Sequence, residues 1–256
     1  MLLYVIRHAQ SANNDLYTRT GGSVGRTADP PLTGIGHRQA QLLAAFLSAA
    51  PPEPDEDAPS LIGEYYARHD RRGFGLSHLY CSLMTRAIQT AGYVAQATGL
   101  SLTALAAIHE RGGLHEVDEA TGEDSGVPGP NRAYFQTEFP QLILPDELGE
   151  VGWWNRPKET LEETVPRARA VWAELLARHR STADRVAVFT HAGFFQSLMT
   201  ALFTTGNTLT APHLDTTNMG FGMSNTAISR FEIDEETIIL RYLNRIDFLP
   251  DELITG

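Results

Sequence analysis

The side chains in this sequence that could do chemistry are basic residues that follow apolar runs. "LLYVI" leads into Arg7 and His8, "RVAVFT" leads into His191, and Arg86 lies one helical turn beyond "SHLYCS". A guanidinium grips anionic oxygens through its planar fork, and an imidazole can attack or donate a proton near neutral pH. Together these residue types indicate a pocket for an anion.

The apolar runs predict buried strands, and most are followed by a helical pattern, as in α/β proteins. Because the carboxyl ends of parallel strands face one crevice, we expect Arg7, His8, Arg86 and His191 to converge there. The expected strands are 2–6, 77–82, 102–108 and 185–190, and the expected helices are 33–50, 83–99, 160–180 and 192–203.

The rest of the chain divides into loops, one insertion and a late hairpin. Residues 51–60 hold four prolines and four acidic residues, which predicts an exposed loop. Residues 109–158 are rich in glycine, proline and aromatics and predict a lid inserted into one domain that spans 1–256. Residues 226–233 and 237–243 predict a hairpin at the sheet edge.

The start of the helix at 160–180 is less clear from the sequence. Thr160 and Glu163 have the spacing of a capping box. Pro166 follows within one turn, so we expect it either to move the start of the helix to a later residue or to kink it.

Composition limits the class of protein and its partners. The chain has 256 residues, 42% hydrophobic and 20% charged, which is typical of a globular protein with a large core. Its formal charge of -11 argues against nucleic acid or an anionic membrane as a partner. The single cysteine and the lack of a signal-peptide core or a long apolar span predict a cytoplasmic protein. The oligomeric state stays open.

Five segments resemble a known family. "RHAQSANN", "LTGIGHRQA", "CSLMTRAIQTA", "HERGG" and "VFTHAG" occur in the order found in the histidine phosphatase superfamily, the phosphoglycerate-mutase-like proteins, and the resemblance spans residues 3 to about 247. It implies a three-layer α/β/α sandwich with a mostly parallel sheet. It also implies a phosphohistidine mechanism on a small phosphorylated substrate, with no metal and no other cofactor.

The resemblance implies roles for five catalytic candidates. His8 corresponds to the nucleophile, Arg7 and Arg86 to the phosphate clamp, His191 to the second histidine and Glu110 to the proton donor. Phosphoryl transfer spreads charge over three oxygens, which explains the arginines. His8 must attack through an unprotonated nitrogen, so we expect its other nitrogen to donate to an oxygen, whereas His191 can stay protonated as a donor.

Substrate contacts are predicted less specifically. The candidates are Asn14, Ala192, Arg132 and Arg156. Asn14 closes an RHxxxxxN pattern but equally suits a helix cap. Ala9 stands where the family more often has glycine, so its backbone needs no left-handed conformation. The aromatics of the insertion either pack it onto the body or select the substrate; they are Tyr134, Phe135, Phe139, Trp153 and Trp154.

Two of the site residues have an alternative interpretation. Glu110 can pair with Arg111 instead of acting as an acid, in which case Glu116 is the next candidate. Cys81 and Arg86 suggest a cysteine phosphatase, but the C-x4-R spacing is one residue short and has no glycine to turn amides toward an anion.

A metal hydrolase and a non-catalytic phospho-ligand-binding protein of the same fold are further alternatives. The metal interpretation rests on His109, Glu110, His115 and Glu116, whose two histidines are six residues apart rather than four. The binding protein is disfavoured because every reacting position is filled.

The sequence favours a phosphatase over a mutase, which is the alternative activity. After Asn14 the chain continues "DLYTRTGGSVGRTADP", unlike the compact segment of the mutases, although Arg19 and Arg26 could partly substitute for it. The insertion also carries an acidic run that suits a triply charged substrate poorly: Glu116, Asp118, Glu119, Glu123 and Asp124.

Overall fold

The architecture is a seven-stranded sheet with helices on both faces. The computed structural model describes residues 1–50, 70, 73–118, 120–204 and 220–256, so the expected loop at 51–60 and Glu119 lie outside the described residues. The strand order is β6-β3-β2-β7-β1-β8-β9. The strands of this sheet are β1 (Leu2–Arg7), β2 (His78–Cys81), β3 (Leu102–Ala104), β6 (Leu142–Ile143), β7 (Arg185–Thr190), β8 (Ile228–Ile233) and β9 (Ile238–Arg245).

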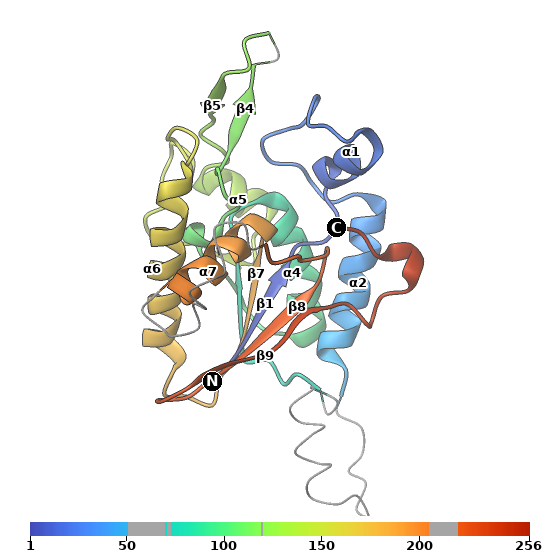
Figure 1. The fold of residues 1–256 in the computed structure, drawn as a ribbon, viewed down its shortest axis with the longest axis vertical. Helices are drawn as coiled ribbons and strands as arrows, with labels where there is room; N and C mark the ends of the chain where they lie inside the picture. Colours follow the sequence, from blue (N-terminus) through green and yellow to red (C-terminus); the bar gives the residue numbers. More distant parts are fainter. Residues whose placement is uncertain (51–69, 71–72, 119, 205–219) are drawn as a thin grey trace, which may run out of the picture.

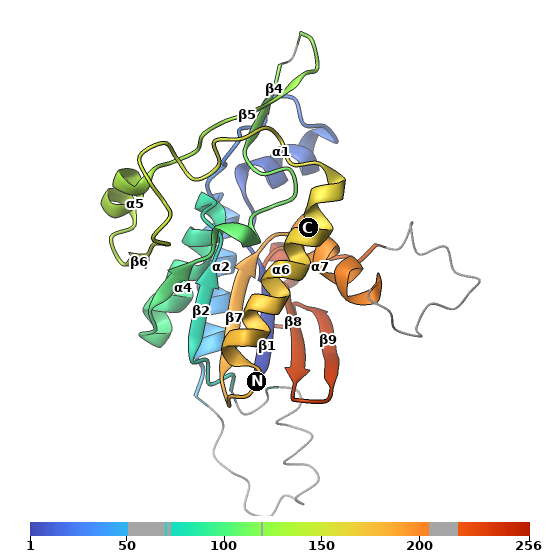
Figure 2. The same cartoon turned by 90° about the vertical axis from the view of Figure 1, so that its left-hand side faces the viewer.

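Helices cover the two faces of this sheet, with α2 and α4 on one side and α6 and α7 on the other (Figures 1 and 2). The predicted three-layer α/β/α sandwich is therefore confirmed. Among the described helices, none combines the length and the apolar character needed to cross a membrane. The described helices are α1 (Ala12–Thr20), α2 (Gly34–Ser48), α4 (Thr85–Thr98), α5 (Arg132–Glu138), α6 (Leu161–His179) and α7 (Ala192–Thr204), with 3₁₀ turns at Ala106–Ile108 and Asp251–Leu253.

The strand pairing brings distant segments together at one end of the sheet. β1 pairs in parallel with β7, and Arg7 lies opposite Thr190. The residues that follow, His8 and His191, are therefore neighbours. β2 pairs in parallel with β7 on its other side, which places the chain after Cys81 beside the same point.

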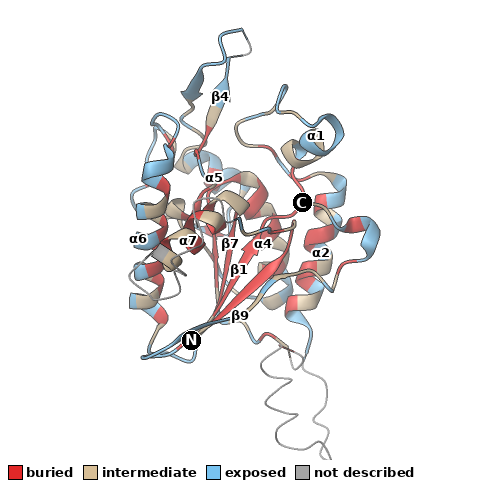
Figure 3. Cartoon of the chain, viewed as in Figure 1, coloured by how far each residue is buried: buried red, intermediate tan, exposed pale blue. Residues whose placement is uncertain are grey.

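Side chains of the central strands alternate between two cores. Tyr4 and Ile6 pack under α2 and α4, while Leu3 and Val5 pack under α6 and α7. This period of two is the signature of a strand buried on both faces. The central strands are accordingly buried along their length (Figure 3).

Local sequence signals set the helix ends. Thr33 caps α2 by accepting from the Gly36 N–H at 3.0 Å. Gly99 ends α4 in a left-handed conformation with φ of 71°, which glycine adopts without strain. At α6 the Glu163 carboxylate accepts from the Thr160 N–H at 2.7 Å, so the helix starts at Leu161 and Pro166 lies inside it.

One predicted strand differs from the structure in extent. The strand expected at 102–108 covers only Leu102–Ala104, and Ala106–Ile108 forms a 3₁₀ turn. The alanines of this run have low strand propensity, and Ile108 instead packs into the core beneath α6. The late hairpin forms as expected, with β8 and β9 antiparallel at one edge of the sheet.

The segment 109–158 contains more than a lid. β4 (His115–Val117) and β5 (Asp124–Gly126) form a separate hairpin that stands above the carboxyl ends of the strands (Figure 1). By contrast, β6 pairs with β3 as an edge strand of the main sheet, and Phe135 of α5 is fully buried in the core. Part of this segment therefore belongs to the body of the fold.

Candidate active site

Arg7 and His8 lie where β1 leaves the sheet, and both side chains are buried. The His8 N–H donates to the Thr190 carbonyl at 2.9 Å, which continues the β1–β7 ladder by one step. The His8 carbonyl accepts from the Asn225 side-chain amide at 3.0 Å and from the Thr226 N–H at 3.3 Å. The histidine is thus held from both neighbouring strands.

The ring of His8 is held in one tautomer. Its Nδ1 lies 2.7 Å from the Ala9 carbonyl oxygen, and because a carbonyl only accepts, Nδ1 carries the proton. Nε2 then presents its lone pair, toward which Arg86 Nε–H donates at 3.1 Å. Burial, with Arg86 and Arg7 nearby, holds the pKa of His8 well below its ordinary value. The imidazole is neutral and suited to attack, and the expected contact with a backbone oxygen is present.

Ala9 supports this geometry without strain. Ala9 is not among the described non-glycine residues with positive φ, which agrees with the expectation that an alanine here needs no left-handed backbone. Its N–H donates to Thr90 Oγ1 at 3.0 Å, and that hydroxyl donates to the Arg86 carbonyl at 2.7 Å. The segment after β1 and the first turn of α4 are therefore joined by one threonine.

Arg86 lies in the first turn of α4, buried beside His8. Its Nη1 lies 3.8 Å from Asp29 Oδ1, and Asp29 also accepts from the Thr85 N–H and hydroxyl at the start of α4. Burial raises the pKa of Asp29, while Arg86 and Thr85 act in the opposite direction. Asp29 is a positioning residue that the sequence analysis did not single out.

His191 lies directly beside His8, with ring centroids 5.0 Å apart. Its Nε2 is 2.7 Å from Ser82 Oγ. Burial, with Arg86 nearby, holds the pKa of His191 well below its ordinary value, which favours the neutral ring. This direction opposes the protonated His191 expected from the sequence, because the arginines already add positive charge beside it.

Three nitrogens around His8 are buried and have no hydrogen-bond partner among the described residues: Arg7 Nε, Arg86 Nη1 and His191 Nδ1. Arg7 Nη1 is anchored on the Met223 carbonyl. Burial lowers the pKa of Arg7 to about 10, with Glu110 opposing and Arg86 adding to the shift, so Arg7 stays charged at neutral pH. Unpaired buried donors cost free energy, and a multivalent anion would satisfy them.

Glu110 lies at the amino end of α7. Its Oε1 accepts from the Arg111 N–H at 2.7 Å and the Phe194 N–H at 3.1 Å, and no ion pair of Glu110 with an arginine occurs within the described part of the chain. A Cβ at Gly193 would lie 2.2 Å from Oε1, so only glycine allows this approach. Electrostatic attraction connects Glu110 with Arg7 and Arg86.

Asn14 serves as a cap. Its Oδ1 accepts from the Ser11 N–H at 3.0 Å and the Ser11 hydroxyl at 2.9 Å, which completes a capping box at α1. Asn225 Nδ2 lies 3.3 Å from the same oxygen. Asn14 therefore caps α1 and also touches the network that holds the His8 backbone, while its contact with a phosphate stays a prediction.

Two other predicted substrate contacts, Ala192 and Arg132, lie in different places in the structure. Ala192 begins α7 next to His191 and is close to the cluster by chain position. Arg132 lies on α5, where its guanidinium donates to the carbonyls of Leu148 and Pro145 at 2.7 and 2.6 Å. These contacts hold Arg132 against the loop of the insertion through Nε and Nη2, and its contact with a substrate stays a prediction.

Arg156 connects the insertion to the site. Its guanidinium stacks 4.0 Å above the Trp154 ring and lies 3.3 Å from His109 Nε2. His109 Nδ1 donates to the Glu110 carbonyl at 2.8 Å. Burial, with the charge of Arg167 adding to it, lowers the pKa of His109 to about 3, so this ring is a neutral link between Arg156 and Glu110.

The aromatics of the insertion are largely packing residues. Phe135 and Trp154 are buried, and Phe139 and Trp153 pack against the core that Phe135 joins. Tyr134 is 41% exposed.

Residues of the weaker alternatives lie elsewhere. Glu116 is exposed on β4, so it does not share the strand-end cluster. His109, Glu110, His115 and Glu116 do not come together as a metal-ligand group among the described residues.

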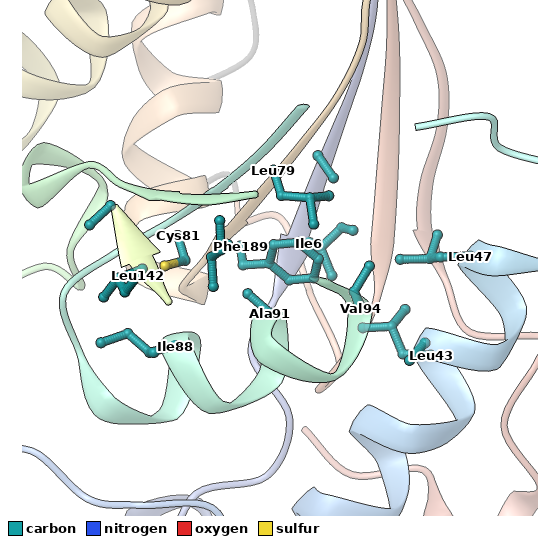
Figure 4. Close-up of a cluster of buried hydrophobic side chains, with 14 of the residues drawn as sticks. Ile6, Leu43, Leu47, Leu79, Cys81, Ile88, Ala91, Val94, Leu142 and Phe189 are labelled. Carbon is teal, nitrogen blue, oxygen red and sulfur yellow. The ribbon is translucent and has the colours of Figure 1, made fainter. Parts of the chain in front are cut away.

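Cys81 faces the core between the sheet and α4 rather than the site (Figure 4). Burial raises the pKa of its thiol, which opposes formation of a thiolate. Ser82, the next residue, points to the other side and reaches His191. The one-residue alternation of the strand therefore excludes Cys81 as a nucleophile.

Fold and site together define an α/β sandwich with a buried cluster of two histidines and two arginines at the carboxyl end of its sheet. The family model of the histidine phosphatase superfamily (branch 1) matches residues 3–56 and 65–246, and the chain belongs to this superfamily. A search of curated proteins finds no match.

Solved structures share the fold at low sequence identity. YhfR of Bacillus stearothermophilus is 19% identical with a TM-score of 0.55, covering 96% of this chain and 98% of its own. A mycobacterial glucosyl-3-phosphoglycerate phosphatase is 18% identical with a TM-score of 0.53, covering 96% and 99%. A phosphoserine phosphatase from Entamoeba histolytica, solved with 3-phosphoglyceric acid, is 15% identical with a TM-score of 0.52, covering 97% and 99%.

Proposed function

We propose that this protein is a metal-independent phosphomonoesterase that forms a phosphoenzyme on His8 and acts on a small phosphorylated metabolite. The observation that carries the proposal is a set of three buried nitrogens without a hydrogen-bond partner, on Arg7, Arg86 and His191, beside an imidazole whose Nε2 is unprotonated. A phosphate ester supplies the oxygens that these donors lack and the phosphorus that Nε2 can attack.

The first half-reaction starts with a change of partner at Arg86. Phosphoryl oxygens are stronger acceptors than a neutral imidazole, so a bound ester draws Arg86 Nε–H away from His8 Nε2. Nε2 then forms a bond to phosphorus while the ester P–O bond breaks. The leaving alkoxide takes a proton from the Glu110 carboxyl group.

The second half-reaction hydrolyses the phosphohistidine. Water attacks phosphorus, the P–N bond breaks, and the Glu110 carboxylate accepts the proton of that water. Inorganic phosphate leaves, and His8 and Glu110 return to their first states. His191, neutral when the pocket is empty, gains affinity for a proton beside the phosphoryl dianion and then donates from Nδ1.

Two observations favour hydrolysis over mutase transfer. Arg19, a candidate to replace the mutase segment, is exposed and pairs with Asp15 at 2.8 Å. Arg26 donates to the His115 carbonyl at 2.9 Å, which engages it with the hairpin. Two of the similar structures are also named as phosphatases.

We also propose that the protein acts in the cytoplasm, as predicted from the sequence. The one cysteine is buried and free, which suits a reducing compartment.

The test is p-nitrophenyl phosphate hydrolysis with and without EDTA, for the wild type, His8→Ala and the control His37→Ala on α2. We expect EDTA and His37→Ala to leave turnover unchanged, whereas His8→Ala abolishes it. A base-stable, acid-labile phosphoryl group should map to the peptide that holds His8. Wild-type turnover by His8→Ala would refute the mechanism.

A second experiment separates phosphatase from mutase. Phosphorylated metabolites are screened for release of inorganic phosphate, beside a coupled assay for conversion of 3-phosphoglycerate to 2-phosphoglycerate. We expect hydrolysis to exceed isomerisation, and mutase turnover far above every hydrolysis rate would favour the alternative.

A further inference from the structure

Three metal-ligand side chains converge at the opposite end of the sheet from His8. His78 begins β2, His179 ends α6, and Asp184 precedes β7. One candidate ligand atom from each lies within 4.8 Å of the other two. His179 Nδ1 is 2.8 Å from Asp184 Oδ2, and His78 Nδ1 is 3.8 Å from Asp184 Oδ1. Three separate segments of the chain therefore meet around one carboxylate.

These distances suit a bound divalent ion. With Zn–N and Zn–O bonds of about 2.0–2.2 Å, ligand atoms of a tetrahedral site lie about 3.3 Å apart. The two imidazole nitrogens lie 2.8 and 3.8 Å from the two different oxygens of the Asp184 carboxylate, on either side of that value, so small side-chain rotations would bring both nitrogens and one oxygen around one centre. His78 is 42% exposed, which leaves the fourth position open to water.

The surroundings of His179 match the outer shell of a metal site. The His179 side chain is only 5% exposed, and its Nε2 lies 3.0 Å from the Tyr80 hydroxyl. When Nδ1 binds a metal, Nε2 keeps the proton and donates it to Tyr80 Oη, and such a contact orients a ligating histidine. Tyr80 is buried, so this contact is held in place.

The groups around His78 can adapt to a metal. Ser77 Oγ lies 2.9 Å from His78 Nδ1, but the same hydroxyl has a second acceptor in the Arg185 carbonyl at 3.3 Å. The Arg185 guanidinium donates to the Phe74 carbonyl. Arg180 donates to the Asp234 and Glu235 carbonyls, so both neighbouring cations are held by other partners.

We propose that His78, His179 and Asp184 form a surface zinc site that clasps β2, α6 and the start of β7 together. Two imidazoles and one carboxylate with an open water position are a typical ligand set for Zn²⁺. Seven residues of extended chain, about 23 Å, separate Asp184 from His191. The site lies near the amino end of the sheet (Figure 2), so the metal takes no part in the chemistry at His8.

The test is Zn²⁺ titration of tag-free, chelator-treated protein by calorimetry, with Co²⁺ spectra as a second readout. We expect one ion per chain and the visible bands of a four-coordinate Co²⁺ site. Because the ion binds only the folded state, Zn²⁺ at a hundred times its dissociation constant should raise Tm by about 5–10 °C.

Variants identify the ligands. His78→Ala and Asp184→Asn should weaken binding by about 100-fold or more, and Tyr80→Phe by about 10-fold to 100-fold. His37→Ala, which removes a partly buried histidine elsewhere, should bind like the wild type.

A different binding result would overturn the zinc-site proposal. If the cluster is only a hydrogen-bonded chain from Tyr80 to Asp184, the wild type will bind no better than His78→Ala, and the proposal is overturned. All variants should keep wild-type p-nitrophenyl phosphate hydrolysis, so failure of the zinc site and failure of the proposed function are separate results.

Discussion

Gly193→Ala is expected to impair proton donation to poor leaving groups while sparing good ones. The new Cβ would lie 2.2 Å from Glu110 Oε1, well inside the ordinary contact range that begins at 3.4 Å. Oε1 must therefore retreat by about 1 Å, which breaks its 3.1 Å bond from the Phe194 N–H. A misplacement of about 1 Å in a reacting group costs about 100-fold in rate.

The dependence on the leaving group makes this prediction specific. Nitrophenolate departs without a proton, whereas the alkoxide of glycerol 2-phosphate needs one. We expect kcat/KM on glycerol 2-phosphate to fall about 100-fold in Gly193→Ala and about 100-fold to 10,000-fold in Glu110→Gln, with small changes on p-nitrophenyl phosphate.

Gly92→Ala is the matched control. It makes the same change inside α4, where a Cβ meets nothing within 4 Å. It should raise the free energy of unfolding by about 1 kcal/mol and leave both activities unchanged. Equal losses on both substrates in Gly193→Ala, or no loss on either, would refute the assignment of Glu110 as the acid.

Three further predictions concern buried polar contacts. Ser82→Ala removes the 2.7 Å contact with His191 Nε2 and should lower kcat/KM about tenfold in steady-state assays; an unchanged value would exclude Ser82 as a positioning residue. His109 stays neutral down to about pH 3 in the folded protein but takes a proton near pH 6.5 when the chain is unfolded, so the free energy of unfolding should decrease as the pH is lowered from 6.5 to 3. In denaturant titrations, His109→Gln should show a dependence of the unfolding free energy on pH that is shallower by about 1.4 kcal/mol per pH unit in this range. Arg167→Met leaves Glu159 buried without its 2.6 Å partner and should destabilise the protein by about 3–5 kcal/mol in urea, most of which the double variant with Glu159→Leu should recover.

Much of the fold could be predicted because its signals are local. Buried strands read as apolar runs, and Thr33, Gly99 and the Thr160–Glu163 pair mark helix ends by their own chemistry. The convergence of Arg7, His8, Arg86 and His191 followed from one rule, that parallel strands end at the same edge. That rule needs only the position of each residue after a strand.

The remaining parts of the site depend on contacts that no local pattern encodes. Ser82 reaches His191 only because β2 lies beside β7 in one particular register. Asn225 holds His8 from a segment more than two hundred residues away, and Arg132 is bound by carbonyls of its own loop. The charge state of His191 depends on its burial and on its distance from the arginines around it, and the sequence contains neither quantity.

The position of β1 also has a consequence for how the chain folds. Leu2 pairs with Arg185 on one side and with Glu232 on the other, so β1 lies between two strands that follow it by more than 180 residues in the chain. β1 can pair only after a loop of more than 180 residues has closed. Closing such long loops is slow, and the early apolar segment stays unpaired during that time. We expect refolding to be slow, with active-site assembly coinciding with the last step of sheet formation.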